Sequence, residues 1–509
     1  MENPNSTISY WHLTAEGKEY PKLNKDIETD TLIIGGGITG VSAAYCLAKV
    51  GVSTTLIEAD RLCAGTTGGT TGKCTIQHGI IYSRLIDTMG LEKASLYAKA
   101  QKEALAFIST FVRANKIECN YEETEAYIYA SSKDQIDLVK KEYEAAKQLN
   151  IAAEYVNAPS FPNDNYCMTG FKGQAAFHPV RYISSLAEHA QKAGAAIYEH
   201  SKAIKVEEDK TVTVKCENGV VIKAKHLILA TQYPIYEGMG VFFSRLYPRR
   251  TYGLAVETLN DWPDGCYINA GTPTRSLRTH VENGKRILIV VGESHPTARG
   301  GDMETHYIEL MHFAGVTTGL NNVVTRWSAQ DYKTPDDLPF IGRLSSRSNI
   351  FVGTGFGKWG LTNGTLAGMM IHDIITSGHS EYEDLLNPHR LNLKASAPTL
   401  LGEISGQVRE LVHSKLKVGD NFLTLKPGEG KVVEFKGKKA GAYLSDDDVL
   451  TIVDTTCTHL GCEVQWNSAE KTWDCPCHGG RYAYDGKLLE GPPKNSLKVI
   501  YKEDKKVRK

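Results

Sequence analysis

The chain has 509 residues, 41% of them hydrophobic, which is enough to form a substantial buried core. At this length we expect about three domain-sized units. The formal net charge is −1, so the overall charge gives no indication of a nucleic-acid or anionic membrane partner.

The N-terminal region and the cysteines predict a cytoplasmic protein. Residues 1–13 lack the basic and apolar regions of a signal peptide. The uncharged run 31–48 contains four glycines, which favour a strand–turn–helix over a membrane span. Seven of the eleven cysteines are scattered along the chain, as is typical of a reducing compartment. We therefore expect no membrane span.

A dinucleotide-binding fingerprint follows the first predicted strand. The apolar run 31–34 leads into Gly35-Gly36-Gly37-Ile38-Thr39-Gly40, and a helical pattern continues to Gly51. The first glycine permits a tight turn, the second lets the backbone approach a pyrophosphate, and the third lets the helix pack on its strand. Residues 52–57 predict a second strand, whose closing acidic residue can hydrogen-bond a ribose hydroxyl. The segment predicts FAD or NAD binding by Gly35, Gly37, Ile38, Gly40 and Glu58.

The loop 64–73 consists largely of small residues and can lie flat beneath a flavin ring. Its candidate cofactor contacts are Thr66, Thr67 and Lys73. Lys73 could also stabilise a reduced flavin anion, which makes it a candidate catalytic residue.

A substrate-binding part is predicted from the segments that follow. Residues 91–115 and 131–150 have helical periodicity, and residues 247–256 and 286–292 have strand-like patterns. Arg275 and Arg278 precede the last of these strands and could clamp a carboxylate, which makes Arg278 the second catalytic candidate. An ordinary surface arginine is the more common alternative for each. His295 could face the flavin or have a structural role.

A second glycine-rich segment, 349–362, reads as strand, turn and helix. With this segment, residues 28–390 resemble the D-amino-acid oxidase superfamily of FAD enzymes. The resemblance implies that the segment contacts the flavin ring through Gly357, Gly360, Leu361 and Thr362, and that the backbone of Val206 contacts adenine. Lys358 stands where a second fingerprint would have its third glycine, so FAD is the only dinucleotide that we expect.

Two Cys/His pairs near the C-terminal end predict an iron–sulfur centre. Cys457 and His459 are spaced C-x-H, and Cys475 and His478 are spaced C-x-x-H. In a Rieske centre two cysteines ligate one iron of a [2Fe-2S] cluster and two histidines ligate the other. A structural zinc site is the alternative, but its cysteines are usually spaced C-x₂₋₄-C.

Residues 417–502 resemble the Rieske domain. The resemblance implies a disulfide between Cys462 and Cys477, and a tyrosine, Tyr482, whose hydroxyl approaches a ligand sulfur. It also implies a proline loop over the cluster at Gly491-Pro492-Pro493. Gly480 stands where high-potential members carry a serine, so one hydrogen bond that raises the potential is missing.

The predicted fold is α/β: a Rossmann-like FAD domain with a mixed-sheet substrate domain, followed by a small all-β Rieske domain. Residues 1–390 form the oxidoreductase, residues 391–416 a linker with a helical pattern over 402–416, and residues 417–509 the Rieske domain. The FAD-binding part is discontinuous, at about 26–86, 173–233 and 334–377. The substrate part occupies about 87–172 and 234–333.

The combination predicts a dehydrogenase that converts two-electron into one-electron chemistry. We expect oxidation of the C–N bond of a small amine or amino-acid-like substrate, with electrons leaving singly through the cluster. The acceptor would be a one-electron carrier protein or a quinone-like molecule. An oxygen-using oxidase stays open, although residues 287–292 lack the lysine that activates oxygen in monomeric sarcosine oxidases.

Two further alternatives belong to other functional classes. An electron-transfer or redox-sensing protein would keep both cofactors and turn over no substrate. A Rieske oxygenase would need a mononuclear iron site of two histidines and a carboxylate.

Overall fold

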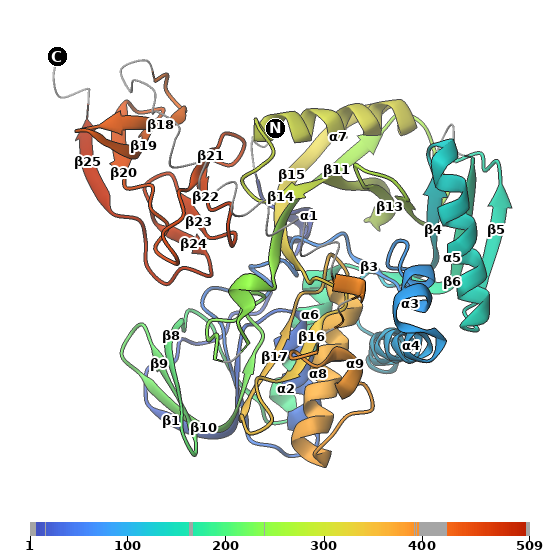
Figure 1. Ribbon diagram of the computed structural model, residues 1–509, viewed down its shortest axis with the longest axis horizontal. Coiled ribbons are helices and arrows are strands. Elements are labelled where there is room, and N and C mark those ends of the chain that lie inside the picture. Colours follow the sequence, from blue (N-terminus) through green and yellow to red (C-terminus); the bar gives the residue numbers. More distant parts are fainter. Residues whose placement is uncertain are drawn as a thin grey trace.

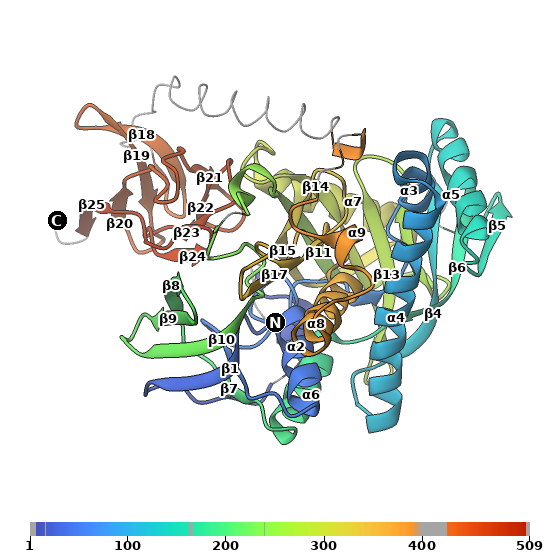
Figure 2. The same ribbon diagram turned by 60° about the horizontal axis from the view of Figure 1, so that its bottom comes forward.

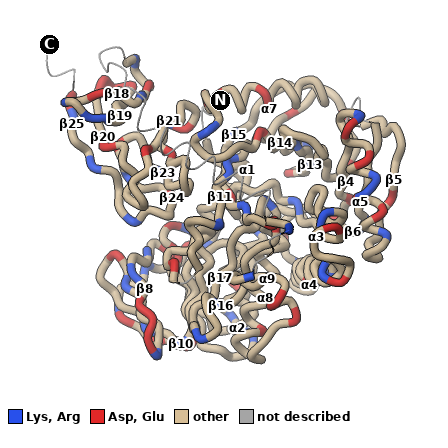
Figure 3. Tube along the Cα trace, in the orientation of Figure 1, with Lys and Arg blue, Asp and Glu red and all other residues tan. Residues whose placement is uncertain are grey.

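The computed structural model describes residues 7–15, 17–161, 166–238, 240–390, 392, 394–396 and 425–504. Most of the predicted linker, including its helical pattern over 402–416, lies outside the described residues. Figure 1 shows two large sheet-containing layers and a smaller C-terminal unit beside them. Charged residues of both signs are distributed over all of these parts (Figure 3).

The first sheet has eight strands and a central order of β16-β17-β10-β1-β2-β7, with β9 paired to β10 and β8 paired to β9. Its central strands are parallel, and β16 is antiparallel to β17. The strands are β1 (Ile27–Ile34), β2 (Thr54–Ile57), β7 (Ala196–Tyr198), β8 (Ala203–Glu208), β9 (Val212–Cys216), β10 (Val221–Leu229), β16 (Phe340–Arg343) and β17 (Ile350–Thr354). The domain boundaries given above stay a prediction.

The apolar run in β1 is continuous because both faces of the strand are covered. Ile33 packs into the cluster that contains helices α2 (Ile38–Lys49), α6 (Pro179–Lys192) and α8 (Gly360–Ser377). Leu32 and Ile34 pack on the opposite face, against residues of β9 and β10. Figure 2 shows the three helices gathered beside this sheet.

The second sheet has nine strands in the order β15-β11-β14-β13-β12-β4-β6-β3, with β5 on β6. It is mixed, because β12 and β4 are parallel whereas the other pairs are antiparallel. The strands are β3 (Lys73–Cys74), β4 (Glu122–Ala130), β5 (Ala153–Asn157), β6 (Cys167–Ala176), β11 (Tyr247–Thr258), β12 (Cys266–Asn269), β13 (Arg275–Glu282), β14 (Lys285–Pro296) and β15 (Leu320–Lys333).

The remaining helices are distributed beside both sheets (Figure 1). They are α1 (Tyr10–Thr14), α3 (Tyr82–Met89), α4 (Leu91–Asn115), the 3₁₀ helix at Lys133–Gln135, α5 (Ile136–Gln148), the 3₁₀ helix at Phe242–Ser244, α7 (Met303–Thr318) and α9 (Glu383–Leu386). The helix predicted over 91–115 is α4, and the strands predicted over 247–256 and 286–292 lie within β11 and β14. No helix in the described ranges has the length and apolar character needed to cross a membrane.

The C-terminal unit consists of two four-stranded antiparallel sheets. One contains β18 (Gly430–Phe435), β19 (Lys438–Leu444), β20 (Val449–Val453) and β25 (Val499–Asp504). The other contains β21 (Gln465–Asn467), β22 (Thr472–Asp474), β23 (Arg481–Ala483) and β24 (Leu488–Glu490). The predicted fold class, α/β followed by an all-β unit, is confirmed.

Helices α2 and α8 approach each other through glycines of α8. A Cβ atom at Gly364 would lie 2.6 Å from Cγ2 of Ile38, and one at Gly368 would lie 2.7 Å from the backbone nitrogen of Ala43. Side chains at these positions would push the two helices apart, so the close packing depends on their absence.

We expect Gly368→Ala to lower the thermal unfolding midpoint. Overpacking of this kind costs about 1–3 kcal/mol. Alanine regains only up to about 1 kcal/mol through its higher helix propensity. Gly315→Ala in α7 is the matched control, because the nearest atom to its Cβ is 3.8 Å away. Calorimetry should show a lower midpoint for Gly368→Ala and an unchanged or higher one for Gly315→Ala. Equal midpoints for the two variants would contradict the packing argument.

Candidate functional site

The fingerprint turn after β1 accepts only glycine at two positions. Gly35 has a φ of +115°, and a Cβ there would lie 2.4 Å from the carbonyl oxygen of Ala230. A Cβ at Gly40 would lie 1.9 Å from the carbonyl oxygen of Gly35. These contacts bring the start of α2 directly against the ends of β1 and β10, which is the close packing expected at a dinucleotide site.

The N-terminus of α2 is suited to hold a diphosphate. Its N-cap is Gly37, which has no side chain to occupy the amide groups of the first turn. The Ile38 N–H donates to Oγ1 of Thr67 at 3.1 Å. Oε2 of Glu58 accepts from the Gly36 N–H at 2.6 Å, so this carboxylate is fixed beside the glycine turn. The partial positive charge of the helix end favours a bound anion here.

The second glycine-rich segment makes a left-handed turn before α8. Gly355, Gly357 and Lys358 have φ values of +73°, +56° and +82°. α8 begins at Gly360, and its N-cap Trp359 makes no capping hydrogen bond through its side chain. The side chains of Leu361 and Thr362 are buried, and Oγ1 of Thr362 lies 3.1 Å from Nε2 of His78. A flavin could therefore meet these two residues only through their backbone.

Lys358 and Asp331 are residues that the sequence patterns did not single out as functional. The Lys358 N–H donates to the Asp331 carboxylate at 2.5 Å, which fixes the left-handed turn. Although Lys358 is an exposed residue, the surrounding protein partly desolvates its ammonium, and nearby Arg249 adds repulsion. Together these effects lower its pKa to about 8. Burial likewise lowers the pKa of Lys73 to about 8.

The surface-arginine interpretation is wrong for Arg278. Its side chain is 2% exposed, donates to the carbonyl oxygen of Gly72 at 2.7 Å and stacks over the ring of Trp11. Arg275 is paired instead with Glu293 at 2.7 Å. Both guanidinium groups thus already have partners within the protein, so the geometry does not favour a carboxylate clamp formed by the two.

His295 and Val206 have structural surroundings. The His295 ring stacks on His306 at a centroid distance of 4.3 Å, and its Nε2 lies 3.1 Å from the hydroxyl of Tyr252. These contacts support the structural alternative for His295. Val206 lies in β8, paired with Val214 of β9, and its contact with adenine stays a prediction.

The two Cys/His loops of the C-terminal unit are built alike. The N–H groups of Cys457 and Cys475 donate to the carbonyl oxygens of Cys462 and Gly480, both at 2.7 Å. The N–H groups of Gly461 and Gly479 donate back to the carbonyls of Cys457 and Cys475, both at 3.0 Å. Cys462 and Cys477 form a disulfide that joins the loops.

The donor set fits a [2Fe-2S] cluster. The His459 and His478 rings lie 4.9 Å apart, and the buried Nδ1 of His459 has no hydrogen-bond partner among the described residues. Burial lowers the pKa of His459, and it lowers that of His478 to about 4. Neutral imidazoles are the protonation state that iron ligation requires.

The disulfide reduces the number of thiolates that could ligate a zinc ion. The sulfur atoms of Cys462, Cys475 and Cys477 lie within 4.8 Å of one another, a grouping that could suggest a metal site. Because Cys462 and Cys477 are bonded to each other, they offer no thiolates. Two cysteines and two histidines are left as donors, as the Rieske pattern requires.

The proline loop covers this centre at Gly480. A Cβ at Gly480 would lie 2.5 Å from Cγ of Pro493. The close approach of the proline ring accounts for glycine at this position, since a serine side chain would displace the loop. Tyr482 lies beneath, with its hydroxyl 3.3 Å from Sγ of Cys457.

Comparison with known proteins gives two family matches. Residues 30–374 match the family described as FAD dependent oxidoreductase, and residues 418–501 match the Rieske [2Fe-2S] domain. A protein of Bacillus subtilis (strain 168) named for a Rieske 2Fe-2S centre, YhfW, is 37% identical over 97% of both chains.

Two further relatives cover the oxidoreductase part. Gamma-glutamylputrescine oxidoreductase of Escherichia coli (strain K12) is 23% identical, over 75% of this chain and 92% of that protein. The crystal structure of glycine oxidase from Geobacillus kaustophilus superimposes with a TM-score of 0.61 at 18% identity, over 72% of this chain and 99% of that one. The two family matches confirm the predicted cofactors, FAD and a [2Fe-2S] cluster, whereas the individual contact residues stay predictions.

We expect Tyr482→Phe to lower the midpoint potential of the cluster. The hydroxyl stabilises negative charge on Cys457, which is greater in the reduced state. Loss of a weak charge-assisted hydrogen bond should shift the potential by on the order of 60 mV. Tyr484→Phe is the control, because Tyr484 packs against Tyr443 away from the sulfur. Redox titration followed by EPR measures both, and an unchanged potential in Tyr482→Phe with an intact cluster would contradict this role.

Proposed function

We infer the function from one premise: the chain belongs to the FAD dependent oxidoreductase family and carries a Rieske [2Fe-2S] domain at its C-terminal end. We propose that it is a dehydrogenase that oxidises the C–N bond of a small amine or amino-acid-like substrate and passes the electrons singly through the cluster. One observation carries this proposal. The loop with His478 is buried against the oxidoreductase part, and the ligand side chain itself is only 7% exposed.

The two cofactors supply complementary chemistry: the flavin accepts two electrons together, and the cluster carries one. Oxidation of an amine to an imine releases two electrons and two protons. Two molecules of a one-electron acceptor would then be reduced for each substrate, and the protons would pass to water. We propose a one-electron carrier protein or a quinone-like molecule as the external acceptor.

The charges around Lys358 support a substrate with a carboxylate. Lys358 lies close enough to Lys73 and Arg249 for their charges to lower its pKa, so cationic groups gather at this end of α8. With pKa values of about 8, both lysines carry mostly positive charge at neutral pH. The relatives named for glycine and for gamma-glutamylputrescine act on substrates with C–N bonds, in line with an amino-acid-like substrate.

The position of Lys285 supports a dehydrogenase over an oxygen-using oxidase. This lysine opens β14, where its ammonium lies 2.5 Å from Glu257 and its side chain is largely exposed. The rest of the strand, from Ile287 to Gly292, contains no lysine. The seven scattered cysteines are free thiols, which supports the proposed cytoplasmic location.

We expect the affinity for a carboxylate-bearing substrate to fall as pH rises through about 8, because Lys358 then loses its proton. Lys358→Met should weaken binding about tenfold at pH 7 and remove this pH dependence. Anaerobic bleaching of the flavin by a panel of amino acids, measured against pH, tests both. Lys285→Met is the control for a surface charge. A retained pH dependence in Lys358→Met would contradict the assignment, and its loss in Lys73→Met would transfer the role to Lys73.

We expect His478→Ala to lose the cluster and keep FAD. Substrate should still bleach the flavin in a single anaerobic turnover, whereas repeated turnover with cytochrome c as one-electron acceptor should slow greatly. Replacement of the exposed His312 on α7 by alanine is the control. Turnover of His478→Ala at the wild-type rate would remove the cluster from the electron path. If no amine or amino acid bleaches the wild-type flavin, the electron-transfer or redox-sensing alternative becomes the better account.

A further inference from the structure

The C-terminal end of β15 lies between the two cofactor sites. On the flavin side, Oγ1 of Thr66 donates to the carbonyl oxygen of Gln330 at 2.7 Å. The Asp331 carboxylate accepts from the Lys358 N–H at 2.5 Å. One short stretch of β15 therefore contacts both the loop predicted to lie under the flavin and the second glycine-rich segment.

The neighbouring side chains of the same stretch point to the iron centre. Nε2 of Gln330 donates to the carbonyl oxygen of Gly479 at 2.9 Å, and the Tyr332 hydroxyl donates to that of His478 at 3.0 Å. Gln330 also donates to the Tyr332 hydroxyl at 3.2 Å, and its Oε1 accepts from Thr297 at 2.9 Å. Gln330, Tyr332 and His478 are all buried.

The backbone at Gly479 favours glycine, and a side chain there would have to displace the end of Gln330. Gly479 has a φ of +74°, and a Cβ there would lie 2.6 Å from Nε2 of Gln330. The backbone of the His478 loop therefore lies directly against the Gln330 side chain.

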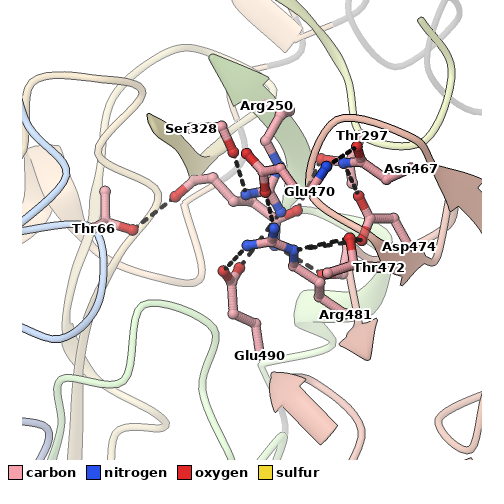
Figure 4. A network of polar contacts seen from close by, with 12 residues as sticks. Thr66, Arg250, Thr297, Ser328, Asn467, Glu470, Thr472, Asp474, Arg481 and Glu490 are labelled. Carbon is pink, nitrogen blue, oxygen red and sulfur yellow. Dashed lines mark hydrogen bonds and ion pairs between the residues drawn. The ribbon is translucent and has the colours of Figure 1, made fainter. Parts of the chain in front are cut away.

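Beside this contact, charged side chains of the oxidoreductase part and of the Rieske domain pair across the interface. Arg250 of β11 is 1% exposed, and its Nη1 donates to Ser328 of β15 at 3.0 Å. Its Nη2 lies 3.7 Å from Glu490 of the Rieske domain, which in turn accepts from Arg481 at 3.0 Å. Figure 4 shows these residues converging, with Thr66 on one side and Asp474 on the other. A shifted position of the Rieske domain would separate Arg250 from Glu490, so these charges favour one docked arrangement over others.

We propose that Gln330 and Tyr332 are positioning residues that couple the two cofactor sites. They hold the His478 loop in a fixed place and complete a continuous route of covalent and hydrogen bonds from Thr66 through Gln330 to Gly479 and His478. This inference rests on the proposed function and names the residues that join its two halves. In each transfer the flavin would lose one electron and one ferric ion of the cluster would become ferrous, and over two transfers the protons of the reduced flavin would pass to water. The external one-electron acceptor would then reoxidise the cluster.

Pulse radiolysis of the holoenzyme tests the coupling without any substrate. A small dose of radiolytic electrons is added, and the absorbance of the flavin and of the cluster reports how fast electrons redistribute between them. We compare wild type with Tyr332→Phe, which removes one hydroxyl, and Gln330→Met, which keeps the approximate volume but removes the donor. Tyr307→Phe is the matched control, because its hydroxyl donates across the same interface to Glu470 rather than to the His478 loop.

Internal redistribution should slow several-fold in both variants and stay at the wild-type rate in Tyr307→Phe. Iron content and the EPR signal of the reduced cluster should be unchanged, which separates coupling from loss of the cluster. The wild-type rate should also be independent of added glycerol, because a docked domain need not move. Wild-type rates in Tyr332→Phe, or a rate that falls with viscosity, would overturn the inference. If Gln330→Met does not fold, Tyr332→Phe decides alone.

The proposed function and this inference fail in different experiments. Absence of any substrate that bleaches the flavin would remove the dehydrogenase proposal while leaving internal redistribution measurable. Normal substrate bleaching with unchanged redistribution in the variants would remove the role of Gln330 and Tyr332 alone.

Discussion

The hydrogen bonds from Gln330 and Tyr332 to the backbone of the His478 loop are the constraint on which the arrangement of the two cofactor sites depends. Their acceptors are main-chain carbonyl oxygens, which do not take part in ligation of the cluster. Backbone acceptors cannot reorient as side chains do, so the contact fixes the loop in position as well as in distance. The His478 ring lies beside the oxidoreductase part, with its centroid 6.5 Å from that of Phe243.

The ion pairs between the oxidoreductase part and the Rieske domain contribute more to the specificity of docking than to its affinity. Removing Arg250 and Arg481 from water costs desolvation energy that their pairing with Glu490 only partly offsets. Burial alone would raise the pKa of Glu490, but Arg250 and Arg481 more than compensate and lower it. A displaced docking would break these pairs without relieving the burial. The ion pairs therefore discriminate among docked positions, while the hydrogen bonds to the loop define the correct one.

Local patterns predicted several of the elements but not their contacts across the chain. The helix over 91–115 and the turn at Gly35, Gly37 and Gly40 follow from periodicity and glycine spacing within a few residues. Gln330 and Tyr332 gave no such signal, because their partners lie 149 and 146 residues away in sequence. The burial of Arg278 was missed for the same reason, since its partner Gly72 is 206 residues away.

Successive side chains of β15 point to opposite faces of the strand, so the strand contributes to both cofactor sites. Gln330 and Tyr332 point to the Rieske domain, and Asp331 between them holds the Lys358 turn. The pairing of β15 with β11 is regular from Tyr247–Lys333 to Ala255–Thr325, and its irregularities fall only beyond that point. A register slip of one residue would exchange the two faces, so the flavin-side and cluster-side contacts would be lost together. The regular register at this end of the strand is thus a requirement of both sites at once.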